Sequence, residues 1–459
     1  MTHLEEAQAR FDKLVNTPAY QDLAWANEIQ DEMAAQRLTV AGRPVCPVLR
    51  PHFISRRQYD AATKASLTFY GALQRLQQMA TANPALLSRL ESIPAEKMLA
   101  QVEPGYPGLT AASYATMQLQ NSHLSVFGHS NDGPTGVLIT DALTDIFWDS
   151  KPLKELRKKY KFAKPHKGAK LLVQAIFAAY KGPTGKGAKR ATALKKFPRI
   201  AIVEASQGRR SVPAADSQLL AEHLRQMGYP TEVIAPEQLE YRNGVLCRGD
   251  FGIEIVYRRI SAQELLVRFD LNHPLLRAYR EGTVKMINSF RADMLSKPAV
   301  LTLLSDETIL AHFPAPERKL LAAHVPWTRM VAPGKTTAGK GTVDLLEYVL
   351  QNREKLMLRP NDVLSDAQTY RGWETEPLTW ERALRLALRT PYVVQERVAE
   401  VSVSFPVMQL GRVEARQMRV ETHCHLFSGK AEGTSATVSD ATSAFSMLNG
   451  LAPVFVLEG

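Results

Sequence analysis

Cysteine is scarce in this chain of 459 residues: Cys46, Cys247 and Cys424 lie far apart, and no CxxC pair occurs. That number and spacing exclude a disulfide framework. Long apolar runs are lacking too, because the longest, Leu171–Tyr180, is far shorter than the ~20 residues that cross a bilayer. The first residues are polar and acidic, unlike a secretory signal. We therefore expect a cytoplasmic protein without a membrane span.

No internal repeat or low-complexity tract is found in the sequence. Hydrophobic residues make up 45% of the chain and charged residues 22%, which is ordinary for a globular protein and excludes wholesale disorder. At roughly 100–200 residues per domain, the length predicts two to three domains.

Acidic residues are nearly missing from residues 151–199. This segment holds sixteen of the 57 Lys and Arg residues but only one of the 46 acidic residues, Glu155, so the net charge of +11 comes from it alone. Such a stretch can hold phosphates, RNA or an anionic membrane surface, or it can be a solvated linker that is helical around Leu171–Tyr180. Few aromatic residues interleave with the charges, which argues against a base-stacking surface. We interpret residues 151–197 as a basic linker and do not expect nucleic acid as a partner.

Hydrophobic patterning predicts a helical N-terminal region followed by mixed α/β structure. Helices are expected at residues 61–78, from Pro84 onward, and at 217–227, 345–352 and 380–388, and strands at 199–204, 231–235, 252–257, 355–358, 392–395 and 452–457. Strand, helix and strand over residues 199–235 form a βαβ unit, which implies a parallel sheet. The fold class is therefore α/β.

Three short motifs suggest chemistry at first sight. Residues 334–341 nearly spell a P-loop, but Gly341 stands where Ser or Thr would bind Mg²⁺, and no strand is expected before them. His423 and His425 share a face of an expected strand, yet two ligands without a third do not make a zinc site. His129 lies beside Asn131 and Asp132 in a sequence typical of a turn, and these residues could equally provide polar site chemistry.

A series of strings from Pro198 onward carries a family resemblance. The strings are Pro198–Glu204, Ile253–Arg259, Pro274–Arg280, Asn288–Arg291, Lys297 with Leu303–Glu307, Val325–Arg329, Leu358–Asp362, Gly372–Glu374, Tyr392–Arg397 and Pro453–Val456. In this order they resemble the circularly permuted ATP-grasp proteins related to glutathionylspermidine synthetase. Residues 105–140 resemble the Mg²⁺-binding hairpin of that family, and Arg50-Pro51-His52 is a further N-terminal match.

The resemblance implies a circularly permuted ATP-grasp fold, in which two α/β lobes hold ATP between them. It divides the chain into a helical N-terminal region with the permuted hairpin (1–150), the basic linker (151–197), a small parallel-sheet pre-ATP-grasp βαβ domain (198–285) and the ATP-grasp lobes (286–459). The implied ancestral reaction joins a carboxylate to an amine through an acyl phosphate made from ATP. The implied nucleotide-binding residues are Lys297, Arg359, Gln395, Glu396 and Arg291.

The metal-binding hairpin departs from the family pattern. Family members carry an acid on one strand and Glu-x-Asn on the next, because Mg²⁺ needs hard oxygen ligands. Counting back from the Pro-x-Gly turn at 134–136 places Gly128 and Ser130 at those two positions, or His129 and Asn131 after a shift of one. The preceding strand, Tyr114–Leu119, has no acid. Candidate metal ligands are therefore limited to Asn131, Asp132 and Asp366.

The phosphate-covering loop departs as well. Family members continue from Lys-Pro-Asn-Asp with a glycine pair and a base, which lets backbone N–H groups approach phosphate. Here Arg359 replaces the lysine, and residues 363–368 contain Asp366 and no glycine. Near the C-terminus, Ala436–Val438 and Ser443–Phe445 replace the family's Arg-x-Ser and Asn-Val strings. The metal-binding hairpin, the phosphate-covering loop and these C-terminal strings thus all differ from the family pattern.

These losses favour a degenerate ATP-grasp protein that is catalytically weak or silent. It would act as a pseudo-ligase, a partner subunit of an active ATP-grasp paralogue, or a scaffold for a small carboxylate or amine ligand. ATP binding would be weak and nearly independent of Mg²⁺. The alternative is an active ATP-dependent carboxylate–amine ligase whose metal ligands come from Asp132, Asp366 or Glu396. A third class is an anion or RNA binder that works through residues 151–199.

Overall fold

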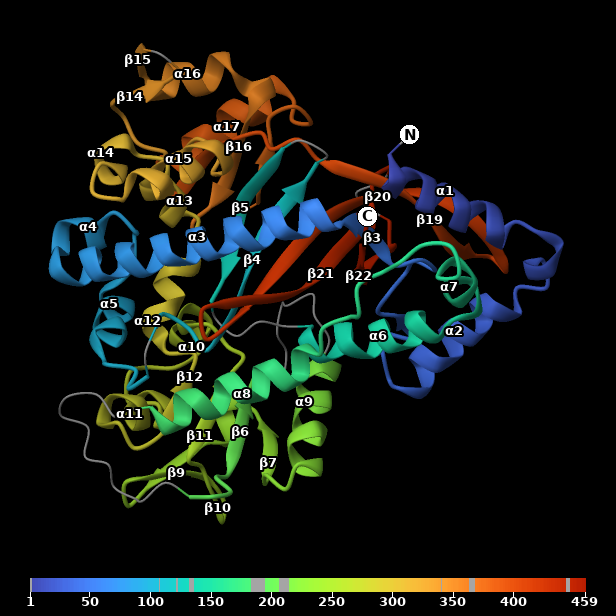
Figure 1. Ribbon diagram of the computed structural model, residues 1–459. Helices are drawn as coiled ribbons and strands as arrows, with labels where there is room; N and C mark the ends of the chain where they lie inside the picture. Colours follow the sequence, from blue (N-terminus) through green and yellow to red (C-terminus); the bar gives the residue numbers. More distant parts are fainter. Residues whose placement is uncertain are drawn as a thin grey trace.

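The computed structural model describes residues 2–106, 108–120, 123–131, 136–182, 195–205, 214–339, 341–362, 368–442 and 446–459. It shows a mixed α/β protein whose three parts are stacked in Figure 1: a lobe with α16 and α17 at the top, a large sheet crossed by the long helix α3 in the middle, and a small parallel sheet at the bottom. No helix within these ranges is long and apolar enough to span a membrane.

The N-terminal region is helical, as the sequence predicts. It comprises α1 (His3–Val15), η1 (Pro18–Tyr20), α2 (Ala24–Ala35), the short hairpin β1 (Thr39–Val40) and β2 (Arg43–Pro44), α3 (Arg56–Ala82), α4 (Pro84–Ser88) and α5 (Pro94–Gln101). Helix α3 begins five residues before its expected start because Ser55 and Gln58 form a capping box, in which each side chain bonds the backbone N–H of the other. Phe69 and Leu73 of α3 are fully buried in the main core.

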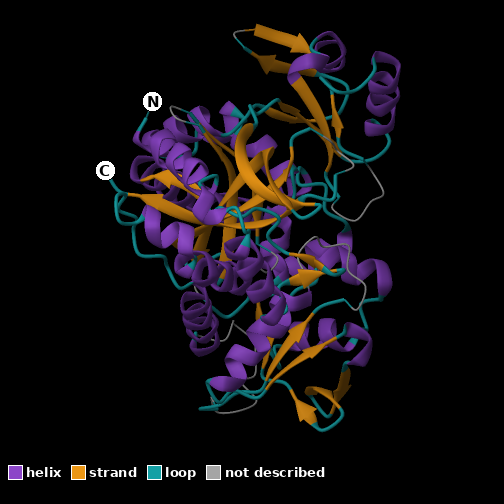
Figure 2. Ribbon diagram, turned by 90° about the vertical axis from the view of Figure 1, so that its right-hand side faces the viewer, coloured by secondary structure: helices purple, strands orange, loops and turns teal. Residues whose placement is uncertain are grey.

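The central sheet is mostly antiparallel and has seven strands in the order β3-β22-β21-β20-β4-β5, with β19 paired to β20. The strands are β3 (His52–Ser55), β4 (Ala112–Leu119), β5 (Leu124–Ser130), β19 (Val401–Gln409), β20 (Arg412–Phe427), β21 (Lys430–Asp440) and β22 (Asn449–Leu457). Strands β4 and β5 form the hairpin expected near residues 105–140, and β22 runs parallel to β3. The side view in Figure 2 shows this sheet enclosed by helices.

The parallel sheet has the order β12-β11-β6-β7 and confirms the predicted βαβ unit. Its strands are β6 (Ile200–Val203), β7 (Thr231–Ile234), β11 (Ile255–Arg258) and β12 (Lys285–Ile287), and its helices include α9 (Ala214–Gln226), α10 (Ala262–Arg268), α11 (Pro274–Glu281) and α12 (Phe290–Asp293). A small antiparallel sheet of β8 (Glu240–Arg242), β9 (Val245–Arg248) and β10 (Phe251–Gly252) follows η2 (Pro236–Gln238). The buried apolar run in β6 gives this sheet its core.

The remaining lobe has an antiparallel sheet in the order β13-β18-β16-β17. Its elements are η3 (Met294–Ser296), α13 (Ala299–Leu304), α14 (Glu307–Leu310), α15 (Ala315–His324), β13 (Thr328–Met330), β14 (Lys335–Ala338), β15 (Gly341–Asp344), α16 (Leu345–Gln351), η4 (Arg353–Lys355), β16 (Leu356–Pro360), β17 (Tyr370–Arg371), α17 (Pro377–Ala387) and β18 (Tyr392–Glu396). Fully buried Trp380 of α17 packs in the core of this lobe, and the expected helices and strands at 345–395 are confirmed.

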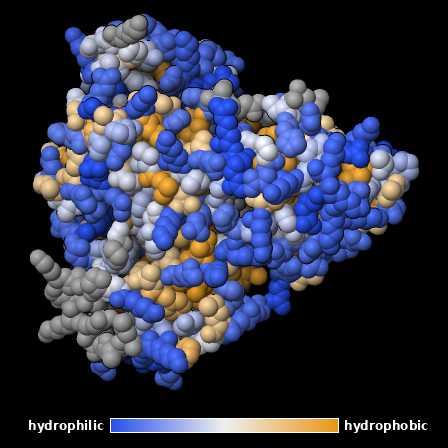
Figure 3. All heavy atoms as spheres, viewed as in Figure 1, coloured by the Kyte–Doolittle hydropathy of each residue, from blue (hydrophilic) through white to orange (hydrophobic). Residues whose placement is uncertain are grey.

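Residues 137–182 connect the central and parallel sheets. They form α6 (Val137–Asp149), α7 (Lys151–Leu156) and α8 (Gly168–Lys181), and the apolar side chains of α8 pack against the parallel sheet. The part of the basic segment that forms α7 and α8 is therefore packed against the rest of the protein. Figure 3 shows that the surface over α7 is hydrophilic, whereas apolar patches lie over α8.

Candidate functional site

A cavity of about 190 Å³ lies where the β4–β5 hairpin meets η3, α13 and β16. Its wall includes Thr116, Gly128, His129, Ser130, Lys297 and Arg359. Pockets that enclose drug-sized ligands measure roughly 300–1,000 Å³. The described residues therefore enclose a volume suited to a small group, such as one anion.

Lys297 lies in this wall, and its charge is already compensated. Its Nζ donates to Oε2 of Glu96 at 2.7 Å, and the two side chains are only 7% and 4% exposed. The same Glu96 oxygen accepts the backbone N–H of Ile93 at 2.9 Å, which holds the carboxylate at the first turn of α5. Glu96 is 201 positions from Lys297, and no local sequence pattern marks it as a partner.

Arg359 and Gln395 are brought together beside the cavity. Nη1 of Arg359 donates to the Phe127 carbonyl at 3.0 Å and to Oε1 of Gln395 at 3.2 Å. Nε2 of Gln395 in turn donates to the Thr328 hydroxyl at 3.1 Å. Nε and Nη2 of Arg359 have no hydrogen-bond partner among the described residues. Desolvation lowers the pKa of this guanidinium, and the charge of Glu421 opposes the shift.

Glu396 and Arg291 take no part in lining this cavity. The Glu396 side chain is exposed, and its backbone N–H donates to the Trp327 carbonyl at 2.8 Å. Arg291 donates from Nε to the Ala100 carbonyl at 2.8 Å and pairs with Glu103 at 2.9 Å. It therefore holds the end of α5 in place.

The hairpin presents no carboxylate to a metal ion. Gly128 and Ser130 of β5 pair with Thr116 and Tyr114 of β4, so neither strand carries an acid at these positions. Asp132 and Asp366 lie outside the described residues. Within the described ranges, no group of three His, Cys, Asp or Glu residues is arranged to hold a metal. The described residues of this region alone therefore do not provide the ligands for the two Mg²⁺ ions that the chemistry of the resembled family requires.

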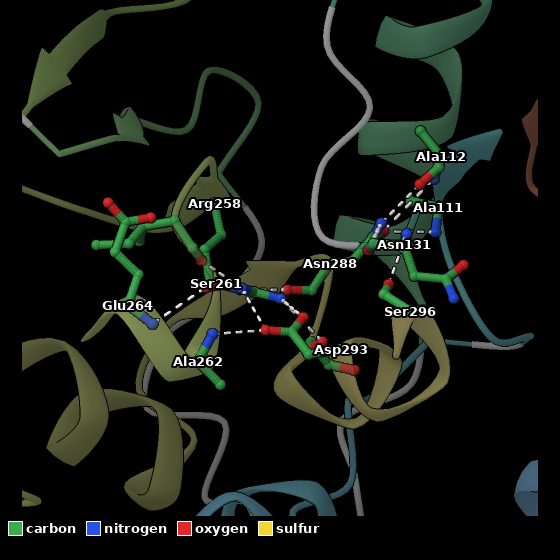
Figure 4. Close-up of polar contacts among 12 residues, drawn as sticks. Ala111, Ala112, Asn131, Arg258, Ser261, Ala262, Glu264, Asn288, Asp293 and Ser296 are labelled. Atoms are coloured by element: carbon green, nitrogen blue, oxygen red, sulfur yellow. Dashed lines mark hydrogen bonds and ion pairs between the residues drawn. The ribbon is translucent and has the colours of Figure 1, made fainter. Parts of the chain in front are cut away.

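Asn131 is fully buried at the end of the hairpin, and its backbone is fixed on both sides (Figure 4). Its N–H donates to the Ser296 hydroxyl at 2.9 Å, and its carbonyl accepts Nδ2 of Asn288 at 2.7 Å. The amide oxygen and nitrogen of the Asn131 side chain have no hydrogen-bond partner in the part of the chain that the structure describes. In Figure 4 this side chain points away from Asn288. An unpartnered buried amide is costly, so this side chain is one that a polar partner would stabilise.

Asn288 links the hairpin to the parallel sheet (Figure 4). Its Oδ1 accepts the Ala111 N–H at 2.9 Å, and its Nδ2 also donates to the Ala112 carbonyl at 2.6 Å. Beside it, Arg258 is fully buried and paired with Asp293, whose carboxylate accepts the Ala262 N–H at 2.6 Å. Arg258 and Asn288, which belong to the strings that resemble the family, therefore hold the fold together. The guanidinium of Arg258 is fully occupied by these contacts and is not available to a ligand.

Arg259, the neighbour of Arg258, is also used inside the fold. Its Nη1 lies 2.5 Å from Asp216 of α9, and Asp216 also accepts the backbone N–H of Gly136 at 3.0 Å. Both arginines of the Ile253–Arg259 string therefore join secondary-structure elements to one another.

His423 and His425 pack as core residues, in agreement with the interpretation from sequence. The ring nitrogens of His423 lie 3.2 Å and 3.0 Å from the hydroxyls of Thr116 and Thr437, and Tyr114 packs edge-on to both histidine rings. Burial lowers the pKa of His423 to about 3 and of His425 to about 4. Both rings are neutral at pH 7.

The sequence that resembles a P-loop folds differently. Strands β14 and β15 pair in antiparallel register from Lys335–Asp344 to Ala338–Gly341. A P-loop wraps phosphate between a strand and the start of a helix. The hairpin excludes that arrangement.

Glu421 is a carboxylate that sequence analysis did not single out. It lies two residues before His423 in β20, so it shares that face of the sheet. Its side chain is exposed to solvent, and it lies in reach of the positive charges of Arg359 and Arg371. In the sequence, the alternation of Glu421, His423 and His425 along one strand is the pattern that marks Glu421 as part of a polar strand face.

Comparisons with known proteins add evidence on the fold. No protein-family model matches the chain, and the curated proteins contain no match. Among solved structures, a glutathione synthetase-like effector from Globodera pallida in its apo form is similar over 97% of this chain and 99% of that one, with a TM-score of 0.63 and 10% identity. The ATP-grasp ligase PsnB, complexed with a minimal precursor, Mg and ADP, aligns over 56% of this chain and 87% of its own, with a TM-score of 0.28 and 16% identity. The first likeness shows a shared fold, which supports the ATP-grasp-like fold expected from the sequence.

Proposed function

We propose that this chain is a circularly permuted ATP-grasp protein in which the Mg²⁺ and phosphate sites have eroded. It acts as a pseudo-ligase: a partner subunit of an active paralogue, or a scaffold for a small carboxylate or amine ligand. The observation that carries the proposal is the buried ion pair of Lys297 with Glu96. The carboxylate of Glu96 offsets the charge of Lys297 and holds its ammonium group on the side of α5, which weakens the attraction of this lysine for phosphate.

The cavity beside this pair supports a small ligand. Nε and Nη2 of Arg359 have no partner among the described residues, and the side chain adjoins a cavity of about 190 Å³. Charge-assisted hydrogen bonds from a guanidinium to a carboxylate are about twice as strong as neutral ones. A ligand with one carboxylate therefore suits the site better than a triphosphate with two metal ions.

Calorimetry on the purified protein tests the proposal. ATP should bind weakly, and the dissociation constant should be nearly the same with Mg²⁺ as with EDTA. Arg359→Met should abolish the binding of ATP and of small carboxylates, whereas Arg385→Met, an exposed arginine of the same lobe, should leave it unchanged. Tight ATP binding that EDTA removes would contradict the proposal.

The active ligase remains a second candidate because of Glu421. Its carboxylate lies in β20 two residues before His423, on the face of the strand that carries His423, and Arg359 is the positive charge that acts most strongly on it. In this alternative it would replace the missing acids of the hairpin. Release of ADP and phosphate in the presence of a carboxylate and an amine, above the level of a Lys297→Ala variant and abolished by Glu421→Gln, would favour it over the pseudo-ligase.

A further inference from the structure

Seven exposed lysines follow one another at intervals of three or four residues along the described part of the basic segment. We call them the lysine row: Lys151, Lys154, Lys158, Lys161, Lys164, Lys167 and Lys170. The segment that carries them runs in Figure 1 from α7, beside α1, to the start of α8 below the central sheet. One acidic residue, Glu155, lies within it.

The backbone beneath the lysine row is anchored. Leu153, Leu156, Tyr160 and Phe162 alternate with the lysines and are buried in the main core. The backbone N–H of Ala163 donates to the Val456 carbonyl at 2.8 Å, and the Lys161 carbonyl accepts the Glu458 N–H at 2.8 Å. The lysines are thus presented from a fixed surface, which lowers the entropy lost when they bind a partner.

Most lysines of the row can bind an external anion, because their positive charges are unpaired or only weakly paired. Lys154, Lys158 and Lys167 pair with Asp149, Glu155 and Asp145, whose side chains are 74%, 47% and 61% exposed. Ion pairs this exposed contribute about 0–1 kcal/mol and are readily exchanged. Lys151, Lys161, Lys164 and Lys170 make no ion pair with a described residue.

The types of side chain in the row indicate which kind of partner it can bind. Its apolar side chains are buried, so none is left to stack on bases or to insert into lipid. Lysine is a compact point charge, which suits phosphate groups without fixed geometry. Binding to a membrane surface is strengthened by apolar side chains that enter the bilayer, whereas contacts to a nucleic-acid backbone need charge alone, so the row suits the backbone better. We propose that the lysine row binds the sugar–phosphate backbone of a nucleic acid, independently of base sequence. Contacts to the backbone need no stacking aromatic residues, so this proposal replaces the expectation from sequence that nucleic acid is not a partner.

Fluorescence anisotropy with a labelled 20-nucleotide single-stranded RNA of mixed sequence tests this proposal. The row variant replaces the four unpaired lysines: Lys151→Gln, Lys161→Gln, Lys164→Gln and Lys170→Gln. The matched control replaces four exposed lysines elsewhere: Lys64→Gln, Lys319→Gln, Lys335→Gln and Lys355→Gln. Both variants have the same net charge, and circular dichroism and thermal unfolding verify that both remain folded.

The salt dependence gives the expected numbers. Each neutralised phosphate of a single strand contributes about −0.7 to the slope of log K against log salt, so seven contacts predict a slope of about −5 for the unmodified protein. The row variant should show a slope of about −2 and at least ~100-fold weaker binding at 50 mM salt, whereas the control should match the unmodified protein. Equal loss in both variants would overturn the proposal. So would binding to vesicles with anionic phospholipid in the absence of RNA binding.

Discussion

Nζ of Lys297 lies 2.7 Å from Oε2 of Glu96, and both side chains are almost completely buried. The pair joins the N-terminal helical region to the wall of the candidate cavity. Because the carboxylate also closes the first turn of α5, its position is set by that helix and not by a ligand. Glu96 therefore decides how much positive charge the cavity offers.

Replacement of Glu96 by glutamine should reveal this role. A buried lysine that loses its partner commonly destabilises a protein by about 3–5 kcal/mol. At the same time the freed charge should raise the affinity of the cavity for pyrophosphate or ATP by about tenfold or more. Chemical denaturation measures the first effect, and calorimetry measures the second.

The double variant Glu96→Gln/Lys297→Met is the control for that experiment. It should recover part of the lost stability and lose the gain in anion affinity, because no uncompensated charge remains. If the Glu96→Gln variant bound pyrophosphate and ATP no more tightly than the unmodified protein, Lys297 would not face the ligand.

Asn288→Ala should destabilise the junction between the hairpin and the parallel sheet. It would leave the backbone groups of Ala111, Ala112 and Asn131 without their partner. Each buried unpaired group costs about 1–3 kcal/mol, so the free energy of unfolding should fall by about 3 kcal/mol or more. Asn272→Ala, at an exposed position, should change it by less than about 0.5 kcal/mol. Equal effects of the two substitutions in urea denaturation would contradict this account.

Stability should fall as the pH drops from 6.5 to 5. Burial lowers the pKa of His52 and His423 to about 3 and of His425 to about 4, whereas histidine in an unfolded chain has a pKa near 6.5. The unfolded chain thus takes up protons in this range while the folded protein does not. Each histidine should remove up to about 1.4 kcal/mol of unfolding free energy per pH unit.

Substitution of single histidines isolates this effect. His423→Gln should flatten the pH dependence by the share of one histidine, measured by denaturation at pH 7.5, 6.0 and 5.0. His312→Gln, at an exposed position, should leave the slope unchanged. Carboxylates whose pKa is raised by burial, such as Asp141, act in the opposite direction, but they are present in every variant, so the difference between variants reports the histidine.

Repair of the hairpin should restore a response to Mg²⁺ only when charge and geometry return together. Gly128→Glu with Ser130→Asn places a carboxylate and an amide oxygen on β5, although the Cβ of residue 128 would meet Thr116 Cβ at 3.3 Å, which is tight. Combined with Glu96→Gln, this change should make ATP binding about tenfold tighter with Mg²⁺ than with EDTA. The matched variant with Gly128→Gln, which has the same size but no charge, should show no such difference.

Much of the fold was predictable because its elements are marked locally. Apolar runs bounded by turns predicted β6, β7, β11, β16, β18 and β22, and helical spacing predicted α3, α16 and α17. The long antiparallel strands β19 to β21 were largely missed. Many of their residues are partly exposed or polar, so their pairing depends on neighbours distant in the sequence and not on a local apolar pattern.

The candidate site was predictable only in part. The resemblance pointed to Lys297, Arg359 and Gln395, and the structure places all three around or beside one cavity. The carboxylates that influence their charges, Glu96 and Glu421, come from distant elements, and only Glu421 lies in a recognisable pattern, the alternation with His423 and His425. Charge compensation of this kind is a property of tertiary packing, and the sequence near Lys297 does not contain it.

The pairing of β3 with β22 has a consequence for the order of synthesis and folding. Val454 pairs with His52, which is 402 positions earlier, and β22 lies between β3 and β21. The central sheet therefore cannot form completely until residue 457 has left the ribosome. Until then β3 has no strand to pair with. Contacts this distant slow folding, and an open strand edge favours aggregation. Recovery of the protein in the cell should therefore depend on chaperones that protect the nascent N-terminal region.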